Sequence, residues 1–204
     1  YSFKLDVQAT LSLADLPPNR EATRVMRHRL LEIYYGNQRD IERATPHVEA
    51  LLALEPGHEL ARRVARQLLS SRGVRLRAAF ALAEAHAATG EGEQALEFYQ
   101  IELETARGPK RVAVLKRIAL LRQDRMGDEL GAYDAMEQAL AADPSDDEVR
   151  IRLTELAKRL SRQLDAAKLI MKAVGLARDP AVRARLTTDL GDLYDSLDPK
   201  NTEQ

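Results

Sequence analysis

The stretch that decides the fold is LAEAHAATGEGEQALEFY, residues 82–99. It contains two helix-length segments rich in alanine and leucine, joined by a turn with two glycines at residues 89–92. The second segment places a small residue, Ala95, one helical turn before a large one, Tyr99. Because residues four apart share a helix face, such a pair lets a second helix approach closely. The stretch therefore predicts two packed antiparallel helices.

The same small–large pair recurs along the chain. The four pairs are Ala44 and Val48, Ala95 and Tyr99, Ala132 and Met136, and Ala166 and Ile170, and their alanines lie 51, 37 and 34 residues apart. A period in the middle thirties is typical of a stacked two-helix unit, which cannot bury its apolar face without neighbours. An array of such units is a surface for holding other molecules, so the pattern favours a binding protein over an enzyme.

These positions resemble the consensus of the tetratricopeptide repeat (TPR) family over roughly residues 21–204. The matching positions are Leu30 to Tyr35, Ala44 and Pro56 in the first repeat, Leu82, Ala83, Gly90, Ala95 and Tyr99 in the next, then Ala132 with Pro144, and Leu190, Gly191 and Tyr194. The consensus tryptophan is absent, and the first interval is too long. The resemblance implies an all-α, right-handed superhelical solenoid of antiparallel helix pairs, a fragment of a long bacterial TPR-array protein.

We expect a single TPR-like domain over residues 1–204. Its approximate repeats are 20–57, 74–109, 110–145 and 146–180, with partial helices at 2–15 and 181–197. The surplus of about seventeen residues in the first interval predicts an extra helix at 59–72, because Leu60, Val64 and Leu68 have helical spacing. Since the pattern begins and ends within a repeat, we interpret the chain as a piece of a longer array.

Composition limits the classes of protein that fit. Hydrophobic residues make up 45% of the chain but aromatic ones only 4%, so the core must be built from alanine, leucine, valine and isoleucine. No stretch approaches the roughly 18–20 apolar residues that span a bilayer, so we expect no membrane insertion. The net charge of −1 argues against a nucleic-acid partner. The absence of cysteine removes disulfides and thiolate metal sites. We expect a cytoplasmic protein, although a leader could have preceded Tyr1.

A search for catalytic groups finds little. The four histidines, His28, His47, His58 and His86, have no paired ligand spacing, and no nucleotide-binding glycine loop or nucleophile motif occurs. The acidic run at residues 146–148 is best interpreted as the start of a helix, where carboxylates complement the dipole. We therefore expect no enzymatic activity, no cofactor and no metal.

Charge is segregated along the chain. Residues 59–78 hold six arginines and one acid, residues 128–148 hold eight acids and no base, and residues 149–178 hold eight bases and two acids. Solvated outer faces explain most such runs. The other interpretation is electrostatic steering of a charged partner.

The TPR resemblance implies that the first helix of each pair lines a concave groove. By this alignment the groove positions are Met26, Arg29, Ile33, Arg77, Phe80, Glu84, Val114, Arg117, Leu121, Glu148, Ile151 and Glu155. Their apolar members form an interrupted stripe bordered by Arg29, Arg77 and Arg117. The stripe predicts an anchor surface for a partner helix or extended segment, and the alternative is that these side chains pack against the adjacent helix. Because Ile33 and Leu121 follow Arg29 and Arg117 by one turn, a clamp for C-terminal carboxylates is not expected.

The sequence as a whole predicts a protein-interaction scaffold or adaptor. Similarity to long bacterial arrays implies motility, polarity or envelope assembly as the setting, and a small GTPase as one candidate partner. A ligand- or peptide-responsive regulatory TPR domain is the alternative. Accessory work for an enzyme elsewhere in a longer protein is a third hypothesis.

Overall fold

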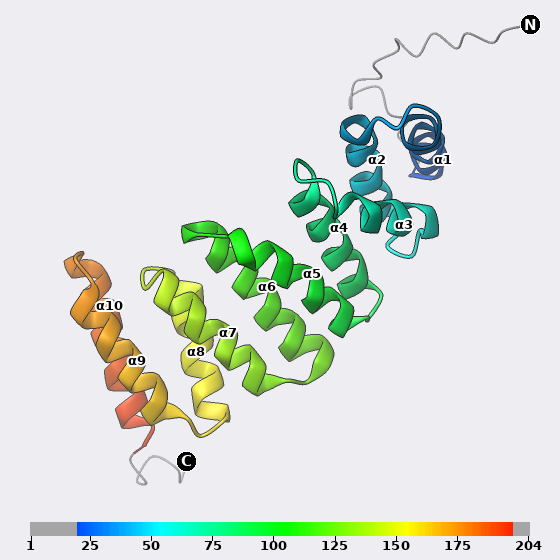
Figure 1. Ribbon diagram of the computed structural model, residues 1–204. Coiled ribbons are helices and arrows are strands. Elements are labelled where there is room, and N and C mark those ends of the chain that lie inside the picture. Colours follow the sequence, from blue (N-terminus) through cyan, green and yellow to red (C-terminus); the bar gives the residue numbers. More distant parts are fainter. Residues whose placement is uncertain (1–19, 198–204) are drawn as a thin grey trace, which may run out of the picture. The chain divides into compact units, whose positions relative to one another are not determined.

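The computed structural model describes residues 20–197, and within that range all regular structure is helical (Figure 1). The elements are α1 (Arg20–Leu31), the π-helix η2 (Glu32–Asn37), α2 (Ile41–Leu54), α3 (Glu59–Leu68), α4 (Arg75–Ala88), α5 (Gly92–Thr105), α6 (Gly108–Met126), α7 (Glu129–Ala142), α8 (Asp147–Arg159), α9 (Gln163–Leu176) and α10 (Pro180–Asp195). The predicted all-α repeat of antiparallel helix pairs is confirmed. The helix expected at 2–15 lies outside the described residues.

The chain forms two compact units, which divide between Ala85 and His86, inside α4. The first unit contains α1, η2, α2, α3 and most of α4, and the second contains α5 to α10. Each unit has its own buried apolar residues, so each is described separately.

The first unit begins with a helix that changes its pitch. α1 continues without a break into the π-helix η2, and the chain turns at Arg39, which has a φ of 52°. The carboxylate of Asp40 then accepts a hydrogen bond from the backbone N–H of Arg43 (3.0 Å) and caps α2. Gly36 and Asn37 form the last turn of η2, so the chain reverses only after them.

The segment expected to form an extra helix contains α3, which occupies residues 59–68 of the predicted 59–72. α3 packs against α2 and also reaches α1, because His58 at its start contacts His28 and Gln67 near its end contacts Tyr35. In the second unit, α10 packs against α9 and reaches α8 in the same way, through Asp189 and Arg150. α3 therefore contacts both of the helices that precede it in the first unit.

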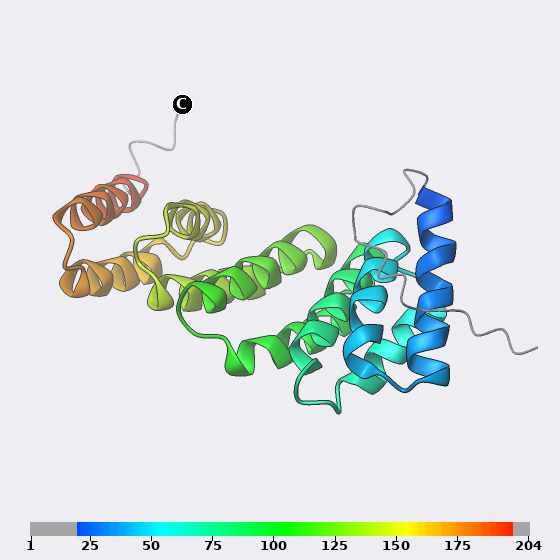
Figure 2. The same ribbon diagram turned by 90° about the horizontal axis from the view of Figure 1, so that it is seen from above.

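The second unit has two rows of helices. In Figure 2, α8 and α10 lie on one side of the unit and α7 and α9 on the other. Consecutive helices pack together along the chain, from α5 against α6 to α9 against α10. Because short turns reverse the chain after each helix, the helices of one row run in the same direction. Each row therefore presents its own outward face.

The pair of α6 and α7 shows how closely these helices approach. Gly127 ends α6 in the left-handed conformation (φ 66°), and Asp128 caps α7 by accepting from the N–H of Gly131 (2.8 Å). Arg122 of α6 donates to the carbonyl oxygen of Gly131 (3.0 Å). A Cβ atom at Gly131 would overlap the Arg122 guanidinium, so no larger residue fits this crossing unchanged.

All four small–large pairs of the sequence are in the core. The four alanines, Ala44, Ala95, Ala132 and Ala166, are fully buried, and their partners Val48, Tyr99, Met136 and Ile170 are at most 3% exposed. The repeat pattern therefore marks the positions at which neighbouring helices meet.

Enlarging one of these alanines should destabilise the protein. We expect Ala132→Leu to lower the free energy of unfolding by about 1–3 kcal/mol, because the side chain has no space to enter. Ala184→Leu, at an exposed position of α10, is the matched control and should change it by less than about 0.5 kcal/mol. Urea denaturation followed by circular dichroism measures both. Equal effects of the two substitutions would contradict the close approach at Ala132.

Candidate functional site

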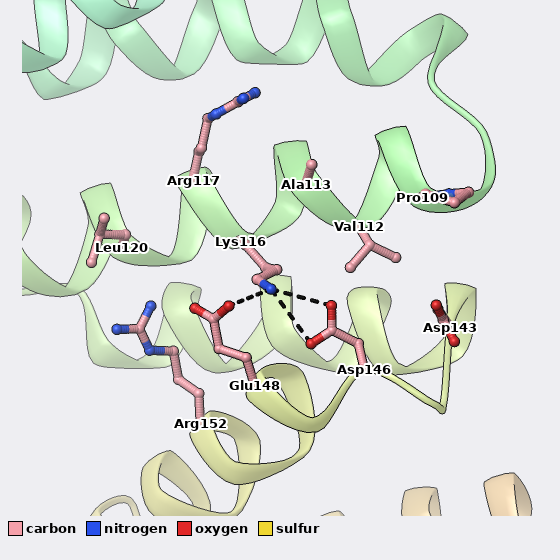
Figure 3. Close-up of a pocket in the computed structure, with 10 residues that line it drawn as sticks. All are labelled: Pro109, Val112, Ala113, Lys116, Arg117, Leu120, Asp143, Asp146, Glu148 and Arg152. Carbon is pink, nitrogen blue, oxygen red and sulfur yellow. Dashed lines mark hydrogen bonds and ion pairs between the residues drawn. The ribbon is translucent and has the colours of Figure 1, made fainter. Parts of the chain in front are cut away.

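An open cleft of about 370 Å³ lies between α6 and α8 in the second unit (Figure 3). Its lining residues are Pro109, Val112, Ala113, Lys116, Arg117 and Leu120 of α6, Asp143 and Asp146 of the loop before α8, and Glu148 and Arg152 of α8. The cleft therefore has both charges and an apolar strip along α6. It lies on first helices of repeats, the helices that the TPR resemblance assigns to the groove.

The centre of the cleft is held by Lys116. Its Nζ lies 3.2 Å from Asp146 and also pairs with Glu148, so one ammonium group joins α6 to the start of α8 (Figure 3). Burial acts to lower the pKa of Lys116, but the hydrogen bonds to Glu148 and Asp146 outweigh it and raise that pKa. Asp146 also caps α8 by accepting from the N–H of Val149 (3.1 Å). Lys116 thus joins two helices through its ion pairs.

The end of the cleft beyond Glu148 is free to meet a ligand. Leu120 is 43% exposed there, and Ile151, one position from Arg152 on α8, is 52% exposed. Within residues 20–197, Arg152 has no ion-pair or hydrogen-bond partner. A cation without a partner beside two exposed apolar side chains can accept an acidic and apolar segment.

An arginine recurs at the same position of three successive first helices. Arg117, Arg152 and Arg185 each come directly before a buried residue of the core, namely Ile118, Leu153 and Leu186. Arg117 lies 3.9 Å from Glu102, and Arg185 lies 3.3 Å from Asp147, so both of these ion pairs are loose. The three side chains form a basic row on the face of α6, α8 and α10.

The structure corrects part of the predicted groove in this unit. Val114 is fully buried and Leu121 is 5% exposed, so both pack against neighbouring helices, which was the alternative interpretation of the stripe. Ala113 and Leu120 of α6, each one residue earlier, are exposed instead. A shift of one residue turns a side chain by about 100° around a helix. Arg117 is partly exposed and Ile151 is exposed, in agreement with the alignment.

The predicted groove residues of the first unit have mixed positions. Arg29 is exposed, whereas Met26 and Ile33 are partly buried. Arg77 forms a two-pronged ion pair with Glu49 (2.7 and 2.6 Å), and Phe80 is 36% exposed. A role of these five residues in binding stays a prediction.

Three histidines form hydrogen bonds that require neutral rings. Nδ1 of His58 accepts from the N–H of Ala61 (3.2 Å), so its proton is on Nε2, which lies 3.1 Å from Nδ1 of His28. His47 stacks on Tyr34, and its Nδ1 accepts from Arg27 (3.0 Å). A further proton on Nδ1 of His58 or on Nδ1 of His47 would face a donor. The three rings therefore contribute to the packing of the first unit through these hydrogen bonds and contacts.

Residues 20–197 contain no group of three or more histidine, cysteine, aspartate or glutamate side chains arranged to hold a metal ion. Among the same residues, no helix is both long and apolar enough to cross a membrane.

Comparison with known proteins finds similarity to solved structures, but not to family models or curated proteins. No family model and no curated protein matches the chain. Among solved structures, it is similar to a crystal structure described as a thermophilic TPR protein in Thermus thermophilus. The two share 22% sequence identity, the alignment covers 84% of this chain and 90% of that one, and the TM-score is 0.43. The chain's own helix pairs and their spacing define its fold. This fold is a TPR-like helical repeat. The repeat boundaries given above stay predictions.

The neutral histidines predict a loss of stability in acid. Burial and the nearby Arg27 lower the pKa of His47 from 6.5 to about 4, and burial is the main cause that lowers the pKa of His58. The unfolded chain binds these protons more readily than the folded chain. The stability that the two neutral histidines contribute is therefore fully present above pH 6.5 and is lost as the pH drops toward 4. Because the His47 ring is partly exposed, we expect a loss of about 1–2 kcal/mol from it.

Urea denaturation at pH 7.5 and pH 4.5 measures this effect. In His47→Gln, which cannot gain a proton, the difference between the two pH values should shrink. The interpretation is wrong if the substitution leaves that difference unchanged.

Proposed function

We propose that this chain is a protein-interaction module that binds a partner segment along the face of its first helices. The observation that carries the proposal is the end of the α6–α8 cleft at which the exposed Leu120 and the unpaired Arg152 line it, with the exposed Ile151 next to Arg152 in the sequence of α8. Large exposed apolar side chains next to a pocket are the usual anchors of a partner, because a few of them supply most of the binding free energy.

The partner should carry an apolar side chain followed by an acidic one. The apolar group would cover Leu120 at its end of the cleft, on one side of the Lys116 ion pairs (Figure 3). The acidic group would pair with Arg152, and the basic row of Arg117, Arg152 and Arg185 would favour further acidic residues along the segment. Charge of this kind mainly raises the association rate, whereas the buried apolar contact mainly sets the lifetime of the complex.

The wider setting follows from the resemblance to long bacterial TPR arrays. We propose scaffold or adaptor work in a motility, polarity or envelope assembly, with a small GTPase as one candidate partner. In that case the segment would be a surface helix of the GTPase, and binding should depend on the bound nucleotide. A regulatory TPR domain that responds to a peptide is the second candidate function, and it shares the same cleft.

Peptide selection tests the proposal without knowledge of the partner. A displayed random-peptide library is selected on the whole chain, and the enriched peptides are measured by calorimetry. We expect an apolar–acidic motif. Leu120→Ser, Ile151→Ser and Arg152→Glu should each weaken binding by about 1–2 kcal/mol, with unchanged helicity.

Leu176→Ser is the matched control, because Leu176 is 70% exposed at the end of α9. It should leave peptide affinity unchanged. Peptides that bind all three cleft variants as tightly as the unmodified chain would place the binding surface elsewhere. A peptide that binds at the cleft and also changes the small-angle scattering profile would favour the regulatory function.

A further inference from the structure

The outward faces of α7 and α9 form a second surface, separate from the cleft. α7 contains three acidic residues and no basic one, and α9 contains two lysines and one acid. The two helices contact each other in the same row of the second unit (Figure 2). One half of this surface is therefore acidic and the adjoining half is basic.

The two halves correspond position by position, with an offset of 34 residues. The buried Ala132 of α7 corresponds to the buried Ala166 of α9. The same offset relates the exposed residues Leu130 and Leu164, Asp134 and Lys168, and Gln138 and Lys172. Both helices thus present a leucine at the first turn and polar residues one and two turns later; Asp134 and Lys168 have opposite charge, and the neutral Gln138 corresponds to Lys172.

Contacts within the chain leave these charges largely unsatisfied. Asp134 lies 3.8 Å from Arg162, and Lys168 lies 3.6 Å from Asp165 with 78% of its side chain exposed. Lys172 is exposed and has no ion-pair partner within residues 20–197. Leu130 and Leu164 are 51% and 55% exposed, which adds apolar surface between the charges.

We propose that a second copy of this chain docks on this surface, around a two-fold axis that runs parallel to α7 and α9 and passes between them. Such an axis places α7 of each copy over α9 of the other, with the helices running in the same direction. Leu130 then meets Leu164 of the second copy, Asp134 meets Lys168, and Gln138 meets Lys172. An isologous contact needs a self-complementary surface of this kind.

The distribution of charge favours a second copy over a different partner. A wholly basic partner would meet the two lysines of α9, and a wholly acidic one would meet the carboxylates of α7. The surface of the same chain, turned by the two-fold axis, supplies the opposite sign at each half. Like charges facing each other would disfavour the register shifted by one helix.

Charge exchange tests the proposal in the whole chain. The variant Lys168→Glu with Lys172→Glu makes both helices acidic, and Asp134→Lys with Gln138→Lys places lysines at these two matched positions of both helices. Sedimentation velocity up to about 200 μM should show dimers of the unmodified chain that weaken with added salt. Each variant alone should raise the dimer Kd by about tenfold or more.

Mixing the two variants is the decisive measurement. In the mixed dimer, the glutamates introduced on α9 of one copy would face the lysines introduced on α7 of the other, and the second α7–α9 contact would be unchanged. We expect the Kd of the mixed dimer to return to within about threefold of the original. Lys110→Glu with Lys158→Glu, which reverses two exposed lysines on α6 and α8, is the control and should not change the Kd.

Three results would overturn the proposal. They are a monomeric unmodified chain at all concentrations, a dimer that resists both charge reversals, and failure of the folded variants to associate on mixing. Circular dichroism and thermal melting of each variant establish that it is folded. The peptide-binding site lies on the other row of helices, so this experiment is independent of the proposed function.

Discussion

Close approach of helices at small residues is the constraint on which this structure depends. At Ala44, Ala95, Ala132 and Ala166 the side chain is a single methyl group with no exposed area. Gly131 brings the backbone of α7 against Arg122 of α6. With only 4% aromatic residues, the chain cannot fill wide gaps between helices. Its core therefore consists of small side chains between closely spaced helices. Dispersion contacts between alanines and leucines stabilise it.

Ion pairs and hydrogen bonds between side chains join each of these helices to the next but one along the chain. Lys116 joins α6 to the start of α8, and Arg150, which is 4% exposed, joins α8 to Asp189 of α10. In the first unit, the contact of His28 with His58 joins α1 to α3. In these pairs the charged and hydrogen-bonding groups already have partners within the chain. The side chains without a close partner, Arg152 among them, are the ones that remain available to another molecule.

The two rows of the second unit differ in chemistry because they have different neighbours. The row of α8 and α10 carries the arginines that follow the cleft, together with Ile151. The row of α7 and α9 carries an acidic and a basic half with a leucine at each first turn. The two rows can differ in this way because each helix pair buries one side against its neighbours, and the residues on its exposed side are free to vary. The proposed partner segment and the proposed second copy would therefore use different rows.

The sequence by itself determined the class of fold and the positions of the closest helix contacts. The small–large pairs marked the core correctly, because a helix period and a residue volume are local properties that a pattern records. The sequence also indicated a helix after Pro56, since Leu60, Val64 and Leu68 repeat at helical spacing. It did not determine that α3 reaches α1 and η2, because that depends on the contacts of His58 and Gln67 with residues about thirty positions earlier.

Only the tertiary structure decided which side chains of α6 face outward. The alignment placed Val114 and Leu121 in the groove, but the rotation of α6 in its packing buries both and exposes Leu120. Aliphatic residues occupy positions 112, 114, 115, 118, 120 and 121, so the sequence of α6 has no sharp boundary between its two faces. The choice between Leu120 and Leu121 depends on how α6 packs against its neighbours α5 and α7, which the sequence of one helix does not encode.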